Sequence, residues 1–188
     1  THQGREAQIR AGMTYVVINL FASTLFLFGV AIVYAATGTV NMALIAERFP
    51  ELPGATQVGI GLWFLVVFGT KAAIFPLFSW LPDSYPTAPT TITAVFAGLL
   101  TKIGVYVLIR FFTLMELEQL GPLLLVIAGL TMIIGVAGAL AQDDVKRILS
   151  FHVVSQIGYM IMGLGFFTVA GVAGAVLFLV HQIPVKTV

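Results

Sequence analysis

The chain has 188 residues and a formal net charge of +1; 59% of its residues are hydrophobic and only 9% are charged. Because a water-soluble domain has about 25% charged residues, this composition excludes an ordinary soluble surface and is typical of a protein surrounded by lipid. The near-zero net charge gives no field that would attract nucleic acid, and a sequence without cysteine excludes disulfides and thiolate metal sites.

Six stretches approach the length of about 20 mostly apolar residues that a membrane-spanning helix needs. Runs this continuous predict helices, because the strands of a membrane barrel alternate in polarity and are about half as long. The fold class we predict is an all-α membrane protein with one transmembrane domain over residues 1–188. In chain order, the spans cover residues 11–36, 58–81, 89–114, 121–141, 148–168 and 170–188, the last one truncated.

The two ends of the chain and its basic residues lead to two further expectations. The sequence starts without Met or a signal peptide and stops at Val188 inside an apolar run, so we expect an interior piece of a longer polytopic protein; a complete small protein with processed ends is the alternative. Basic residues near span ends favour the cytoplasmic side, which predicts a cytoplasmic N-terminus in a multi-pass cell membrane protein. The two sides carry Arg5, Arg10, Lys146 and Arg147 against Arg48 and Arg110.

Three lysines lie within the predicted spans, whereas all eight carboxylates lie in the links or at the N-terminus. A lysine at the centre of a membrane helix costs about 3 kcal/mol, and such residues usually face a protein interior or a water-filled path. Lys71 and Lys102 have apolar neighbours for two turns or more on both sides, which leaves little scope for their ammonium groups to reach the interface. Lys186 lies nearer an end and suits that alternative better.

A buried cation needs a carboxylate, a polar water path or the loss of its proton. No predicted span contains Asp or Glu, so we expect a partner carboxylate from outside these residues. Loss of the proton in an apolar setting would let Lys71 or Lys102 act in a proton relay. His181, five residues before Lys186, is an equally good candidate for a relay group or a hydrogen-bonded core residue.

Other features point to a path and not to a metal centre. For His152 we keep the structural interpretation, and no histidine pair has ligand spacing with a carboxylate, so we expect no metal and no cofactor. Pro76 removes a helix hydrogen bond near Lys71, and broken helices near the midplane line cavities in ion-coupled transporters. Thr70 and Thr101 can hold water between charged groups; an ordinary proline kink is the alternative.

Four strings of residues occur in an order that resembles one family. They are residues 71–76 leading into Trp80-Leu81-Pro82-Asp83, then Ala88-Pro89-Thr90, then 99–106, and then 142–151. This order is similar to that of the antiporter-like proton-translocating membrane subunits. The family includes the large membrane subunits of respiratory complex I and those of Mrp-type cation/proton antiporters, and the strings look most like the D-type subunit of Mrp antiporters.

The resemblance implies a bundle of about fourteen helices built on two inverted repeats, each with a broken helix. The chain would cover the sixth to the eleventh helix, with 58–81 as the first broken one. By resemblance Lys71 is the central proton-binding residue, Lys102 is a connecting lysine, and the relay continues on the helix of His181 and Lys186. The family's glutamate that pairs with the first lysine lies on the helix just before this chain.

Three positions, on two of the predicted helices, depart from the family pattern. Many members have His where Gln156 stands, and Mrp-like relatives often have a His pair where His181 and Gln182 stand, with no proline at the position of Pro184. Glutamine can hold water but cannot carry the charge of a proton, so the relay details on these two helices are the part of the pattern that this sequence matches least.

The function we expect is that of a proton-translocating subunit of a multisubunit monovalent cation (Na+)/proton antiporter. Its partners would be other membrane subunits of the same complex, protons, the lipid bilayer and, as a candidate ion, Na+, but no nucleic acid. One alternative is a proton-pumping membrane subunit of NADH–quinone oxidoreductase. Another is a structural or assembly subunit whose lysines only pair with their neighbours.

Overall fold

The computed structural model describes residues 2–88, 93 and 96–187, and regular structure over these residues is helical. Six helices within them are long and apolar enough to cross a membrane, which confirms the predicted all-α membrane fold. The long helices are α1 (His2–Thr37), α3 (Gly54–Ala72), α6 (Thr101–Leu114), α7 (Gly121–Leu140), α8 (Val145–Gly165) and α9 (Val169–Thr187). The short elements are α2 (Met42–Arg48), η1 (Phe49–Glu51), α4 (Trp80–Ser84), the π-helical turn η2 (Phe96–Leu100) and η3 (Glu118–Leu120).

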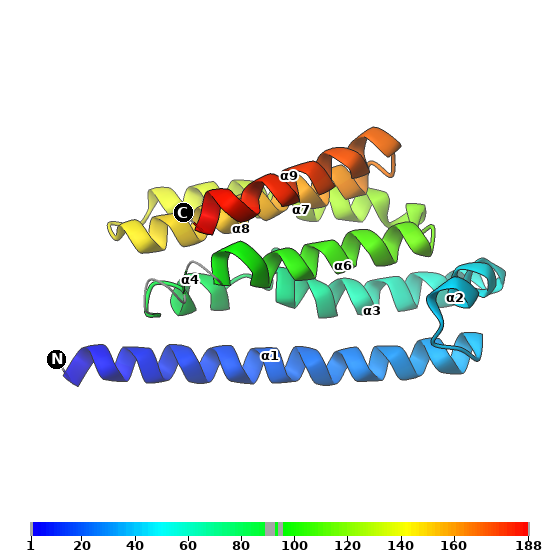
Figure 1. Cartoon of the computed structure of the whole chain (residues 1–188), viewed down its shortest axis with the longest axis horizontal. Coiled ribbons are helices and arrows are strands. Elements are labelled where there is room, and N and C mark those ends of the chain that lie inside the picture. The colour runs from blue at the N-terminus through cyan, green and yellow to red at the C-terminus, as the bar shows by residue number, and fades with distance from the viewer. Residues whose placement is uncertain (1, 89–92, 94–95, 188) are drawn as a thin grey trace.

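The long helices run nearly parallel to one axis and form layers (Figure 1). Helix α1 forms one outer layer, α3 and α6 lie in the middle, and α7, α8 and α9 form the opposite side. The most extensive packing joins α7 to α8, and α6 contacts α3, α8 and α9. The core between these helices is built from large apolar side chains such as Phe64, Leu108, Phe112, Ile157 and Leu164.

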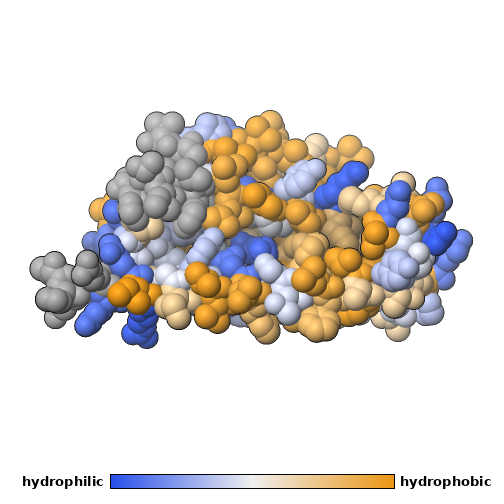
Figure 2. Space-filling view, turned by 60° about the horizontal axis from the view of Figure 1, so that its bottom comes forward, coloured by the Kyte–Doolittle hydropathy of each residue, from blue (hydrophilic) through white to orange (hydrophobic). Residues whose placement is uncertain are grey.

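The surface matches a protein embedded in lipid. Hydrophobic residues cover much of the middle of the face in Figure 2, and hydrophilic residues gather at the two ends of the long axis. Helix α1 exposes large apolar side chains along its length, among them Val16, Leu20, Phe21 and Leu27. Exposed apolar side chains of this number are compatible with lipid or another membrane helix as the surroundings, because neither is aqueous.

Small residues let α7 and α8 approach each other closely. A methyl group on Gly135 would lie 2.6 Å from the backbone nitrogen of Ser155, and one on Gly158 would lie 2.9 Å from the Ala128 carbonyl oxygen. Glycines at such contacts allow membrane helices to pack by direct backbone approach. Helices α7 and α8 therefore form one tightly packed pair.

The helix bounds differ from the expected ones in two places. The stretch 58–81 was expected as one span, but α3 ends at Ala72 and a separate short helix, α4, begins only at Trp80. Of the stretch 89–114, residues 89–92, 94 and 95 lie outside the described residues, and the part from Phe96 onward is a π-helical turn followed by α6. The other helices lie within a few residues of the expected spans, except that α1 extends to His2 at its N-terminal end.

Candidate functional site

The end of α3 is the structural break that places Lys71. Ala73 adopts the left-handed conformation with φ of 61°, and its backbone N–H bonds to the carbonyls of Gly69 and Thr70. The N–H of Ile74 also returns to the Gly69 carbonyl at 3.1 Å, as in a Schellman-type helix end. Pro76 therefore lies beyond the end of the helix instead of inside it, and the structure has a complete helix end at Ala72 in place of the alternative, an ordinary proline kink.

Two side chains satisfy backbone groups that the break leaves free. The indole Nε1–H of Trp80 donates to the Thr70 carbonyl at 2.9 Å, and the Phe75 backbone N–H donates to the Thr131 hydroxyl oxygen at 3.1 Å. Thr131 is fully buried in α7 and donates its own proton to the Ile127 carbonyl. An unpaired backbone group away from water costs several kcal/mol, so Trp80 and Thr131 stabilise the broken segment.

Replacing Thr131 with valine tests this tether. Valine keeps the shape but leaves the part-buried Phe75 N–H without an acceptor, so we expect a destabilisation of about 1–3 kcal/mol. Thermal unfolding of the purified full-length subunit in detergent would measure it as a lower Tm. Thr113→Val is the matched control, because the Thr113 hydroxyl donates only within its own helix. Equal Tm values for the two variants would show that Thr131 does not stabilise the broken segment.

Lys71 lies in the last turn of α3, one residue before the helix ends, and is half-buried. Its Nζ donates to the Ser23 hydroxyl of α1 at 3.3 Å. Among the residues that the structure describes, no carboxylate lies within ion-pair distance of Lys71. The neighbouring Thr70 hydroxyl donates back to the Val66 carbonyl of its own helix. A hydroxyl is thus the polar partner that these residues offer to the Lys71 ammonium group.

Lys102 is the most deeply buried charged residue in the described chain, with 3% of its surface exposed. It follows the π-helical turn η2, and its Nζ donates to the Ala97 carbonyl of that turn. Helix α9, which carries Lys186, packs against both η2 and α6. The structure therefore places the two lysines on elements that contact each other.

Gly104 connects the Lys102 helix to the Lys71 helix. A methyl group at Gly104 would lie 2.7 Å from the Ala72 backbone nitrogen and 3.0 Å from the Lys71 carbonyl carbon. Helix α6 therefore directly touches the backbone of the last turn of α3. Sequence reasoning missed this glycine, although its place two residues after Lys102 is a signal in hindsight.

The buried face of α9 carries a different polar residue from the one expected. His181 is exposed, whereas Gln182 is 5% exposed and its Oε1 has no hydrogen-bond partner among the described residues. Gln182 and Lys186 are four residues apart, so they share one face of the helix. The structure thus joins Gln182 and Lys186 on the inner side of α9 and directs His181 outward.

The remaining predicted polar positions lie on α8. His152 is exposed, and Gln156 is partly buried with an Oε1 that has no partner among the described residues. Within the same described ranges, no group of three or more His, Cys, Asp or Glu side chains is arranged to hold a metal ion.

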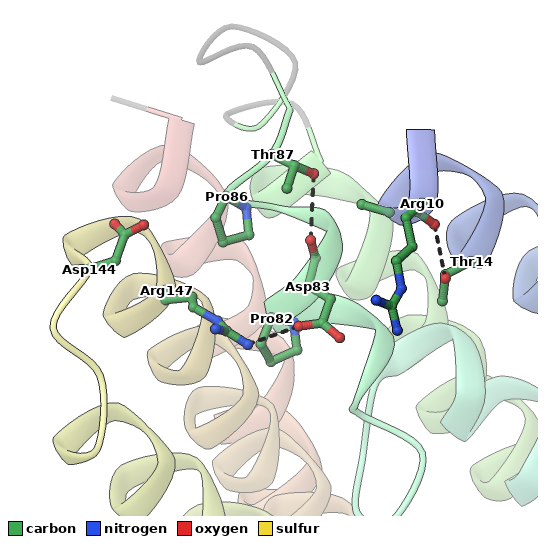
Figure 3. Close-up of a pocket in the computed structure, with 9 residues that line it drawn as sticks. Arg10, Thr14, Pro82, Asp83, Pro86, Thr87, Asp144 and Arg147 are labelled. Carbon is green, nitrogen blue, oxygen red and sulfur yellow. Dashed lines mark hydrogen bonds and ion pairs between the residues drawn. The ribbon is translucent and has the colours of Figure 1, made fainter. Parts of the chain in front are cut away.

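A pocket opens at the end of the molecule that holds the N-terminus. It has a volume of about 480 Å³ and lies between α1, the α4 end and the start of α8, lined among others by Arg10, Thr14, Thr87 and Asp144. Asp83 pairs with Arg147 at 2.9 Å, and Figure 3 shows Arg10 approaching Asp83 from the other side. Because the pair is exposed, it contributes at most about 1 kcal/mol. Charged side chains of both signs thus line the pocket beside apolar ones, among them Pro82 and Pro86.

Residues 2–186 match the model of the family described as "NADH:quinone oxidoreductase/Mrp antiporter, TM". The chain belongs to this family. The family description contains both of the transport alternatives that the sequence left open. Membership therefore establishes the kind of membrane subunit without separating an antiporter from a respiratory complex.

Curated relatives in the family carry antiporter names. The chain is 50% identical, over 97% of its length, to a protein of Alkalihalophilus pseudofirmus that is named as the D-type subunit of a Na(+)/H(+) antiporter. It is 45% identical, over 96% of its length, to a putative antiporter subunit mnhD2 from Staphylococcus saprophyticus. The chain spans 38% and 36% of the lengths of these two relatives.

Two solved structures of the family have the same fold. A chain in the Mrp complex from Dietzia sp. superposes with a TM-score of 0.89 at 34% identity, covering 96% of this chain and 34% of that one. A chain in the membrane-bound sulfane sulfur reductase, an archaeal respiratory membrane complex, superposes with a TM-score of 0.91 at 32% identity, covering 97% and 38%. The fold is therefore shared by an Mrp complex and a respiratory complex.

Proposed function

We propose that the chain is part of a proton-translocating subunit of a multisubunit monovalent cation/proton antiporter, with Na+ as the exchanged cation. The observation that carries this proposal is the arrangement of Lys71, Lys102 and Lys186 inside the spans, where α6 touches the end of the broken helix α3 and α9 packs against α6. The antiporter names of relatives at 50% and 45% identity support the choice of an antiporter.

In this proposal protons move between the buried lysines. Lys71 has a neutral hydroxyl partner in Ser23, so its ammonium group is not fixed by an ion pair with a described residue. The positive charges of Lys102 and Lys186 repel each other, so the arrival of a proton on one favours its departure from the other. Such coupling passes charge along the row from Lys71 through Lys102 towards Lys186. Thr70, Thr101 and the segment at Pro76 would line the path.

The partners and the orientation follow from the same reasoning. We place the subunit in the plasma membrane next to other membrane subunits of one complex, with the end that carries Arg10, Lys146 and Arg147 on the cytoplasmic side. A carboxylate that pairs with Lys71 would come from outside the described residues. Since His181 points outward, it joins the relay only if another helix or subunit covers that face of α9.

A respiratory subunit is the second candidate, and the likeness to the sulfane sulfur reductase complex supports it. A vesicle experiment separates the two. The complete complex is expressed in a host without its own Na+/proton antiporters, and everted vesicles are energised with a respiratory substrate. An antiporter reverses the internal acidification when Na+ is added. A respiratory pump shows no response to Na+ but loses its own electron-donor-driven acidification when the subunit is deleted.

A further inference from the structure

Two buried amide oxygens, one on α8 and one on α9, have no hydrogen-bond partner among the described residues. They are Oε1 of Gln156 and Oε1 of Gln182. The whole Gln182 residue is 5% exposed, and Gln156 is partly buried. A buried acceptor without a donor is destabilising, and most buried polar atoms in native proteins have a partner. Helices α8 and α9 pack against each other, so a donor shared by the two oxygens would satisfy both.

The packing of α8 against α9 has a register that two contacts define. A methyl group on Gly163 of α8 would lie 2.9 Å from the Cβ of Ala175 of α9. Four residues earlier in α8, the ring centroid of Tyr159 lies 6.1 Å from that of Phe178, which is three residues later in α9. The two helices are therefore antiparallel, and each step back along α8 is matched by an equal step forward along α9.

The same register places the two glutamines opposite each other. Gln156 lies three residues before Tyr159 on α8, and Gln182 lies four residues after Phe178 on α9. Residues three or four apart share one face of a helix, so both glutamines lie on the faces by which α8 and α9 contact. The next level beyond the two aromatic rings is therefore a pair of amide groups, and it is the level of the two oxygens without partners.

Lys186 lies one turn beyond Gln182 on the same face of α9 and is half-buried. Long side chains of a helix lean towards its N-terminus, so this position directs the lysine stem back towards the level of the amides. Neither α8 nor α9 contains Asp or Glu. Neutral oxygens are thus the acceptors that this interface offers to the Lys186 ammonium group.

One water molecule meets the hydrogen-bonding needs of this level. It has two O–H groups, one for each Oε1, and its own oxygen can still accept a hydrogen bond. Buried water typically makes about three hydrogen bonds to polar groups that have no other partner. A metal cation fits less well, because the positive charge of Lys186 lies one turn away and the two helices carry no carboxylate to offset it.

We propose that Gln156 and Gln182 bind one water molecule between α8 and α9, and that this water accepts a hydrogen bond from the Lys186 ammonium group. The water stabilises a positive charge within the span without a carboxylate. The role of Lys186 rests on the proposed function, whereas the water site rests on the packing of the two helices and on the two amide oxygens. The competing interpretation is that the two amide groups bond directly to each other.

A structure of the complete complex in lipid nanodiscs, at a resolution that shows ordered water, tests the site. We expect one water peak within about 3.2 Å of both Oε1 atoms. A direct amide–amide hydrogen bond, or two separate amides without a peak between them, would overturn the proposal. A peak that is present in Na+ buffer but absent when choline replaces Na+ would identify a cation and would overturn it as well.

Variants of the two glutamines test the role of the water. Gln182→Met and Gln156→Met keep the length of the side chain but remove its amide, so each should abolish the water peak. We expect each to lower the exchange rate in everted vesicles roughly tenfold at unchanged complex abundance, the factor that corresponds to one lost hydrogen bond to a charged group. Gln142→Met is the matched control, because the Gln142 amide already donates to the Gly138 carbonyl.

The outcomes distinguish this inference from the proposed function. Parental exchange in both methionine variants after loss of the peak would refute the bond between the water and Lys186. Normal exchange in both Lys71→Ala and Lys102→Ala would refute the lysine relay and leave the water site standing, because the peak is observed without measuring transport. If a methionine variant assembles poorly, the structure of the parent complex decides whether the site exists.

Discussion

Replacing Lys71 with alanine is expected to lower cation-driven proton exchange by roughly a hundredfold or more, the range typical for the loss of a group that gives and takes protons. Lys71 is the only ionisable side chain of α3, so no neighbour on that helix can take its place. The measurement is the initial rate of the pH change in everted vesicles that carry the complete complex, normalised to the amount of assembled complex.

One further variant, with a control, distinguishes the release of a proton from the positive charge at position 71. Lys71→Arg keeps a positive charge that Ser23 can still contact, but an arginine side chain does not release its proton in a protein. We therefore expect normal assembly with little exchange. Lys146→Ala is the control, because Lys146 is exposed at the start of α8. Exchange by Lys71→Ala at the rate of this control would favour a structural subunit over a relay.

Replacing Gly104 with alanine is expected to have the largest effect on stability. The new methyl group would lie 2.7 Å from the Ala72 backbone nitrogen, and a backbone atom cannot move aside as the end of a side chain can. Helices α6 and α3 must then separate at their closest contact. Overpacking of this kind costs about 1–3 kcal/mol and occasionally more. Thermal unfolding in detergent would detect it as a lower Tm, accompanied by a lower exchange rate.

Gly129→Ala provides the matched control for this substitution. Gly129 also lies within a membrane helix, but no side-chain or neighbouring backbone atom lies within 4 Å of the position of an added methyl group. Alanine has a helix propensity about 1 kcal/mol better than that of glycine. The control should therefore be neutral or slightly stabilising. A Gly104→Ala subunit that is as stable as the Gly129→Ala subunit would show that α3 and α6 are not locked at this point.

The sequence was sufficient for the fold but only for part of the site. Long apolar runs predicted the spans, because the bilayer imposes both their length and their composition. The break was expected near Lys71 and was attributed to Pro76, but the helix ends through Ala73, where a residue other than glycine takes a positive φ, and Pro76 lies beyond that end. Nothing in the local sequence marks that position. Its conformation depends on partners distant in sequence, Trp80 and Thr131, and such pairings do not appear in a local pattern.

The lysines illustrate the same difference between local and tertiary information. That Lys102 is buried could be predicted, because apolar residues surround it on both sides in the sequence. The face of α9 that turns inward could not, because apolar residues occupy most of its circumference and leave no periodicity to read. His181 was singled out because it can carry a proton and lies five residues before Lys186, although Gln182 is the residue that faces the core.

The close packing of α7 against α8 has a consequence for movement within the molecule. Backbone contacts at Gly135 and Gly158 leave little freedom for these two helices to slide past each other. The segment between α3 and α4, by contrast, is held by single hydrogen bonds. Trp80 donates to the Thr70 carbonyl, and the Phe75 N–H donates to the Thr131 hydroxyl. If a proton on Lys71 changes the local geometry, the displacement should be taken up by α3, α4 and α1. Helices α7 and α8 would then serve as the stationary frame, to which the moving part is attached at Thr131 and through the Asp83–Arg147 pair.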